Sequence, residues 1–135
     1  MDDTLGTLAR ADAARLKAFA ETLIADLGDV EVLQSRSGLV MLPMRDTAGG
    51  VAFHLGEVLM SEAHICKGSV EGYGMRRVHD LEAAMAMALV DLALALDVRA
   101  ADCAAFCGRE AAALAAQDTD VLRRVEATRV NMETF

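Results

Sequence analysis

Three residues of types that bind metal ions have the same parity in the middle of the chain. His54, Glu62 and His64 would share one face of a sheet if residues 53 to 65 formed an unbroken strand. Two imidazoles and a carboxylate are a workable ligand set. The set spans about eleven residues at ~3.3 Å each, however, which is too long a reach for one ion, and Gly56 is a residue type that bends or ends strands. We therefore expect no metal site here.

Cysteine offers a second kind of chemistry. Cys103 and Cys107 are spaced i, i+4 and would lie on one face of a helix, as a soft-metal or redox pair could. That helix is alanine-rich, and no CxxC turn or nearby histidine accompanies the pair, so the spacing favours small hydrophobic side chains packed in a seam. With Cys66 the thiols are odd in number in a chain without an export signal, and we expect them reduced and metal-free.

Glycine and serine patterns carry weaker signals. Gly49-Gly50 and the segment from Gly68 to Gly74 could cradle phosphate, but neither leads into a helix through GxGxxG or GxxxxGK, and tight turns explain both. No GxSxG motif brings a serine to a histidine and an aspartate. The sequence assigns no catalytic residue.

Asp91 is the one charged residue in the apolar segment from Ala83 to Leu96. A carboxylate in a buried helix needs a partner or must be protonated. An arginine from the sheet or from a neighbouring subunit is the natural candidate. The alternative is that Asp91 lies on a narrow strip that faces solvent.

Composition bounds the class of protein. The 135 residues are 54% hydrophobic, which predicts one domain over residues 1–135 with a buried core. The 13 basic and 21 acidic residues give a net charge of -8, so we expect no nucleic-acid partner. The acidic N-terminus does not resemble a signal peptide, and the longest apolar stretch is shorter than the ~20 residues of a membrane-spanning helix. We expect a cytoplasmic protein without membrane contact.

The first and middle segments differ in hydrophobic period. Residues 4–27 read as helical, broken near Ala11-Asp12 and ended by Gly28, with Thr4 and Asp12 as candidate N-caps. Residues 30–36 and 39–44 then read as two strands of a hairpin around Ser37-Gly38. After a loop at residues 46–50, further strands are predicted at 51–55, 58–67 and 70–75.

The C-terminal part is helical. Asp80 is a good N-cap for a helix that reaches Leu96, and two more helices are predicted at residues 101–116 and 118–130, split near Gln117-Asp118. The order predicts an α+β fold, a small antiparallel sheet in the middle of the chain packed by N-terminal and C-terminal helices. Because residues 83–96 are apolar on every side, the sheet, flanking helices or a partner must cover them, and we expect self-association of the isolated chain.

Several of these segments resemble the G subunit family of the bacterial carbon-phosphorus lyase system, PhnG. The order and spacing agree over nearly the whole chain. The most specific parts are the strand from Phe53 to Ala63 and the closing Thr128-Arg129-Val130. The others are Ser37-Gly38-Leu39-Val40, Gly72-Tyr73-Gly74 with Arg77, the Ala-rich helix with Asp91, and the end from Ala127 to Met132.

The resemblance implies a function in phosphonate metabolism. Members of the family act with the H, I and L subunits to convert MgATP and an alkylphosphonate into ribose 1-phosphonate 5-triphosphate and adenine, and with H, I and J they form a stable core. The resemblance implies a supporting subunit that binds no cofactor itself. By this resemblance the assembled complex is a transferase, and we expect no turnover by the isolated chain. A stand-alone metal-dependent hydrolase and a phosphonate- or nucleotide-binding protein remain alternatives.

Four charged residues in the family-like segments are candidates for an interface or a shared active site. They are Glu57, Arg77, Asp91 and Arg129. The alternative to a role at an interface or shared active site is that these residues are ordinary charged groups at a strand end, on the surface or near a helix C-terminus. No metal ligand is assigned.

Overall fold

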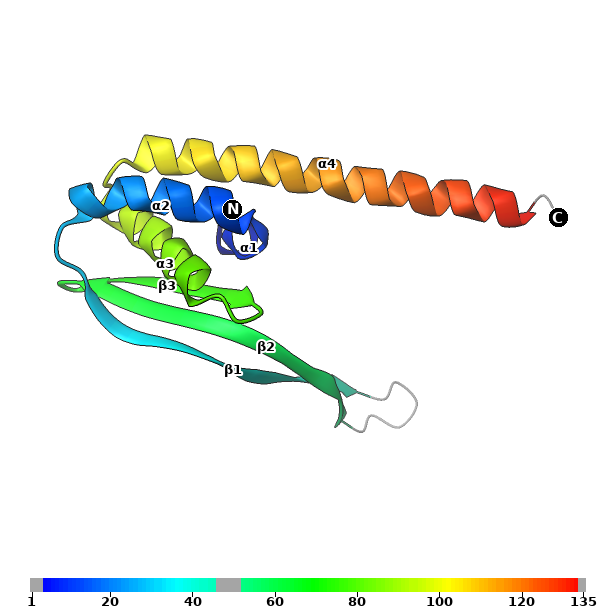
Figure 1. Cartoon of the computed structure of the whole chain (residues 1–135), viewed down its shortest axis with the longest axis horizontal. Coiled ribbons are helices and arrows are strands. Elements are labelled where there is room, and N and C mark those ends of the chain that lie inside the picture. Colours follow the sequence, from blue (N-terminus) through cyan, green and yellow to red (C-terminus); the bar gives the residue numbers. More distant parts are fainter. Residues whose placement is uncertain (1–3, 46–51, 134–135) are drawn as a thin grey trace.

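The computed structural model describes residues 4–45 and 52–133, with side chains described over 4–40 and 57–128. Helices precede and follow a three-stranded antiparallel sheet, so the predicted α+β class is confirmed (Figure 1). The elements are α1 (Thr4–Arg10), α2 (Ala13–Leu27), β1 (Glu31–Arg45), β2 (Ala52–Lys67), β3 (Val70–Arg77), α3 (Leu81–Leu96) and α4 (Ala100–Glu133).

The predicted helix boundaries at two aspartates are confirmed. Asp12 precedes α2 and its carboxylate accepts the Arg15 N–H at 2.9 Å, while Asp80 precedes α3 and accepts the Ala83 N–H at 3.1 Å. Each bond satisfies a backbone donor that the first turn of a helix leaves without a partner. Gly28 ends α2 with φ of 72°, a conformation that suits glycine.

The sheet has the order β1-β2-β3, and its strands are longer than predicted. The predicted hairpin at Ser37-Gly38 is wrong, because β1 runs through it and Gly38 lies opposite Met60 of β2. Likewise Gly56 does not divide β2. Neither Ser37 nor Gly38 adopts the positive φ of a tight hairpin turn, whereas Gly68, in the turn between β2 and β3, has φ of 65°.

Glycines of β3 let α3 lie directly on the sheet. A Cβ added to Gly72 would come within 2.5 Å of the Ala88 carbonyl oxygen, and one added to Gly74 would meet the Ala84 carbonyl and the Ala88 nitrogen. Only a residue without a side chain permits this approach. The two glycines therefore set the distance between α3 and β3.

Helix α3 is the centre of the core. The sheet covers one side, and α1, α2 and α4 pack around the others, so flanking helices of the same chain supply the cover that its apolar sequence requires. Its buried residues are Ala83, Ala84, Ala86, Met87, Ala88, Val90, Leu92 and Ala93. Because the sheet and the flanking helices cover α3, this helix gives no reason for the expected self-association. The association itself stays a prediction.

Helix α4 is one helix of 34 residues, so the predicted division at Gln117-Asp118 is wrong. No glycine or proline interrupts it there. The Asp118 carboxylate accepts a bond from Arg10 of α1 at 3.1 Å and does not cap a new helix. At ~1.5 Å per residue α4 is about 50 Å long, and it extends well beyond the other helices (Figure 1).

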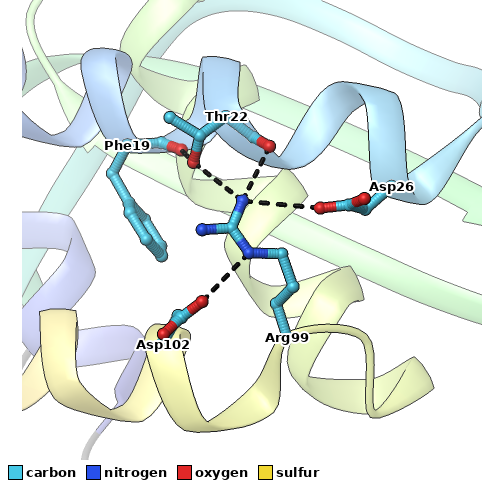
Figure 2. A network of polar contacts seen from close by, with 5 residues as sticks. All are labelled: Phe19, Thr22, Asp26, Arg99 and Asp102. Atoms are coloured by element: carbon cyan, nitrogen blue, oxygen red, sulfur yellow. Dashed lines mark hydrogen bonds and ion pairs between the residues drawn. The ribbon is translucent and has the colours of Figure 1, made fainter.

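Three sets of contacts fix the first part of α4 on α2. Figure 2 shows Arg99, just before α4, donating to the Thr22 carbonyl at 2.7 Å and bridging Asp26 and Asp102 at 3.5 and 3.1 Å. Phe19 lies beside this network (Figure 2). Its ring stacks on the ring of Phe106, with centroids 4.6 Å apart. Further along, Arg15 holds the buried Glu110 through two bonds of 2.7 and 3.0 Å.

Across residues 4–45 and 52–133, none of the helices combines the length and the apolar character that crossing a bilayer requires.

Candidate interaction surfaces and polar clusters

A two-stranded arm projects from the body of the protein. We use this name for residues 39–45 of β1 and 52–59 of β2, because β3 pairs with β2 only from Met60 to Lys67. The arm and the far part of α4 point the same way, and Figure 1 shows the sheet and the long helix diverging toward that side. The chain thus has two projecting segments, the arm and the far part of α4, that its own core does not cover.

Both faces of the arm carry exposed aliphatic side chains. Leu39 lies opposite Leu59 on one face, and they are 63% and 39% exposed. Val40, on the other face, is 42% exposed. Removal of exposed aliphatic surface from water is favourable, and such surface often marks an interaction site. A partner that surrounds the arm would bury both faces.

The far part of α4 is exposed throughout residues 115–128. Val121, Leu122 and Val125 are each more than half exposed, in a stretch where Asp120 and Arg124 form an i, i+4 ion pair of 2.6 Å. A solvent-exposed helix of mixed charge with an aliphatic stripe is typical of a helix that packs against another chain.

The sheet face that lies away from α3 carries a cluster of charged and polar side chains. Glu62 accepts a bond from the Tyr73 hydroxyl at 3.3 Å and lies 3.7 Å from the Arg36 guanidinium, and His64 lies 3.6 Å from Glu71. Burial, followed by the nearby Glu62 charge, raises the pKa of Tyr73. Tyr73 therefore stays protonated and donates to Glu62 at physiological pH.

The predicted parity of Glu62 and His64 is confirmed, since both side chains lie on this outer face. Their partners differ. Glu62 contacts Arg36 and Tyr73, whereas His64 lies beside Glu71. The side chain of His54 lies outside the described residues. Among side chains that the structure describes, no group of three or more metal-binding residues converges.

Next to this cluster lies a hollow of about 310 Å³. It forms where Gly38 has no side chain, and Val40, Met60 and Met75 line it together with the Arg36-Glu62 pair. An added Cβ at Gly38 would meet no heavy atom within 4 Å. The glycine thus leaves free space on the outer face of the sheet.

A serine and a histidine meet at the corner between β3 and α3. Ser37 Oγ lies 2.8 Å from His79 Nδ1, the geometry of a nucleophile and a base. Among the described residues no carboxylate bonds the other ring nitrogen of His79, so the third member of a triad is not present there. The preceding Val78 has φ of 67°, which is rare for a β-branched residue.

Buried Ser61 holds this corner in place. Its hydroxyl donates to the Val78 carbonyl at 2.7 Å and accepts the Asp80 N–H at 2.8 Å. Val78 also donates its N–H to the Leu59 carbonyl at 2.8 Å. Three hydrogen bonds thus fix the strained conformation where the arm leaves the body.

The four candidate site residues do not form one site. Glu57 is exposed on the arm opposite Met41, on the face that continues toward α3, whereas Arg77 is exposed at the end of β3 opposite Met60 on the outer face. Arg129 belongs to the far part of α4, and its side chain lies outside the described residues. The structure therefore separates them, and their roles at an interface stay predictions.

The fourth candidate, Asp91, has a partner within the chain. Its carboxylate accepts the backbone N–H of Tyr73 at 3.0 Å, so that partner is a peptide amide and not the expected arginine. Burial raises the pKa of Asp91, and the bond from Tyr73 offsets part of the effect. Asp91 is half-buried at the edge of the sheet, which also excludes a strip that simply faces solvent.

The three cysteines are free thiols. Cys103 is buried and Cys107 half-buried on one side of α4, where Cys103 belongs to the core, as the packing interpretation predicts. Burial raises the pKa of both, which favours the unreactive thiol form.

Sequence reasoning missed the Arg36-Glu62-Tyr73 cluster. The signal was present in the parity of the three strands, because residues that face one another across antiparallel strands share a face. The predicted hairpin at Ser37-Gly38 hid it, since that hairpin paired Arg36 with its own neighbours and not with Glu62 of β2.

A family model described as Phosphonate metabolism protein PhnG matches residues 2–135 of the chain. No curated protein sequence matches the chain at a significant level.

Proposed function

Because the chain belongs to the PhnG family of phosphonate metabolism proteins, we propose that it is a supporting subunit of the carbon-phosphorus lyase core. In this role it assembles with the H, I and J subunits and acts with the L subunit. The assembled complex converts MgATP and an alkylphosphonate into ribose 1-phosphonate 5-triphosphate and adenine. The chain contributes binding surface, and nucleoside-bond cleavage belongs to another subunit.

The observation that carries the proposal is that two segments, the arm and the far part of α4, project from the core. The arm exposes Leu39, Val40 and Leu59, and α4 exposes Val121, Leu122 and Val125, in a chain whose core is complete without them. A protein that acted alone would gain nothing from leaving these side chains in water, whereas a subunit buries them on assembly. In this proposal Glu57 on the arm and Arg129 on α4 are candidates for contacts with partner subunits.

Co-expression with tagged I subunit, together with H and J, tests the proposal. Two exposed aliphatic residues of α4 are replaced in the variant Leu122→Asp with Val125→Asp, and the matched control is Glu21→Gln on the exposed side of α2. We expect the double variant to lose co-purification and the control to retain it. Retention by both, with growth on methylphosphonate unchanged, would contradict an interface on α4.

The candidate charged residues provide a finer test. Single changes Glu57→Ala, Arg77→Ala and Arg129→Ala should weaken assembly only where the side chain is buried against a partner, since removal of one member of a buried ion pair reduces association by tens- to thousands-fold. Turnover of MgATP and methylphosphonate by the purified chain alone, above a mock purification, would refute the supporting role.

A further inference from the structure

The two edges of the sheet are built differently. At the β3 edge, α3 supplies acceptors for outward-facing amides: Asp91 accepts the Tyr73 N–H at 3.0 Å, and Met87 Sδ lies 3.3 Å from the Met75 nitrogen. Met87 and Asp91 are one helical turn apart and lie along the strand. This edge is closed to an added strand.

Among the described residues, none supplies such acceptors to the β1 edge. The Leu59 carbonyl accepts a bond from Val78, so odd-numbered residues of β2 direct their backbone groups toward β3 and even-numbered ones toward β1. Their partners in the central part of β1 are even-numbered, as in Arg36 with Glu62. Ser35, Ser37 and Leu39 therefore direct N–H and C=O groups outward, at the free edge of a three-stranded sheet.

The open part of this edge has defined limits. Register irregularities lie between Val32 and Gln34 and between Leu42 and Pro43, and bulges and proline are the usual means of blocking strand addition. The regular window is residues 34–42. It carries a single charge, Arg36, and its midpoint is Gly38.

We propose that two copies of this chain join edge to edge through β1, antiparallel, about a twofold axis at Gly38. Aligning the two windows places Ser37 opposite Leu39 of the second copy and Arg36 opposite its Val40, so outward-facing amides and carbonyls meet one another. The two Arg36 side chains stay apart by about four residues, or ~13 Å, and no like charges face each other. One six-stranded sheet results.

A second copy fits this edge better than an unrelated strand because the window is self-complementary about its own midpoint. Pairing with a strand of another protein would not require a glycine at the centre of the β1 window or register irregularities at equal distances on either side of it. The inference concerns the isolated chain and does not depend on the proposed subunit role.

A cysteine at the axis tests the register. Gly38 faces Gly38 of the second copy at a position without hydrogen bonds, where Cα atoms are about 4.5 Å apart, a separation that a disulfide spans. An added Cβ meets nothing within 4 Å, so Gly38→Cys should fold normally. The matched control is Val40→Cys, equally accessible and two residues away, whose two copies would lie ~13 Å apart.

Under mild oxidation we expect the Gly38→Cys chain to form a disulfide dimer of twice 14.3 kDa, while Val40→Cys and the wild-type chain stay at a common low background. Equal cross-linking of both variants, or none in either, would overturn the proposal. The wild-type background accounts for Cys66, Cys103 and Cys107.

Solution mass provides an independent measurement. Leu39→Lys places a charge beside the paired edge and should raise the dimer Kd by about tenfold or more, whereas Leu122→Lys on α4 should leave it unchanged. Light scattering after size exclusion reports both. A wild-type chain that is monomeric at its highest attainable concentration would show that this edge does not pair with a second copy, and the proposal would be wrong.

Discussion

Asp91 of α3 accepts the outward-facing backbone N–H of Tyr73 of β3 across 3.0 Å, and it therefore closes one edge of the sheet. The same contact puts a half-buried carboxylate among apolar side chains, and burial raises its pKa. For a carboxyl whose folded pKa is raised, the related stability is fully present below the unfolded pKa and is lost as the pH rises through the folded pKa.

Asp91→Asn should remove this pH dependence, because the amide keeps an oxygen acceptor for Tyr73 but does not ionise. We expect its advantage over the wild-type chain to grow as the pH rises from below 4 through the folded pKa. Relative to Asp91→Asn, Asp91→Leu leaves the Tyr73 amide without its acceptor and should cost ~1–3 kcal/mol at every pH. Urea unfolding across this range measures both. A Leu variant as stable as the Asn variant would show that the bond is unimportant.

Arg15 and Glu110 provide a test of ion-pair burial. The Glu110 side chain is 4% exposed, and its bond from Arg15 is the main reason for its lowered pKa. Arg15→Ala should destabilise the fold clearly at neutral pH. The deficit should shrink as the pH falls through the folded pKa of Glu110, because protonation of Glu110 then breaks the ion pair in the wild type as well.

The matched control for that pair is Arg10→Ala, which breaks the Arg10-Asp118 pair between α1 and α4, where both side chains are more than half exposed. Exposed pairs contribute little, so its melting temperature should stay near that of the wild type. Equal loss in the two variants would mean that burial of Glu110 does not matter.

Gly74→Ala should damage the core. The new methyl group would meet backbone atoms of Ala84 and Ala88, which cannot turn away as a side chain can, and α3 would have to shift. Such overpacking costs ~1–3 kcal/mol or more. Gly38→Ala, on a strand of the same sheet with open space above it, should leave the unfolding midpoint nearly unchanged. Similar midpoints for the two variants would contradict the close approach of α3.

Val78→Gly should stabilise the protein, because Val78 is a β-branched residue at φ of 67° and its side chain is largely exposed. Relief of the conformational strain, of order 1 kcal/mol or more, exceeds the added entropy of glycine in the unfolded chain. Val78→Ala keeps the Cβ and should gain less. Thermal unfolding of the three proteins ranks them, and a destabilised glycine variant would show that the corner is not strained.

The features that sequence predicted well depend on local chemistry. Asp12 and Asp80 cap helices because a carboxylate placed just before an apolar helical stripe satisfies the first amides, and this requires no knowledge of distant residues. The shared face of Glu62 and His64 follows from strand parity alone.

The features that it missed depend on distant pairing. Ser37-Gly38 resembles a turn locally, but Gly38 pairs with Met60 along a continuous strand, and the tertiary contact decides. Asp118 resembles an N-cap, but Arg10 of α1 engages its carboxylate and the helix continues. The contact between Asp91 and Tyr73 likewise needed the position of α3 over the β3 edge, which the glycines of β3 determine.

The projection of α4 beyond the core implies that the protein has two levels of stability. From about residue 115 onward, the described side chains are exposed and no core contact adds to the helical hydrogen bonds, so this half of α4 resembles an isolated peptide helix, which at this length is marginal in water. Its amides should exchange with solvent through local fraying, far faster than those of α3. Slow exchange in these amides would therefore report that α4 is bound, before any activity is assayed.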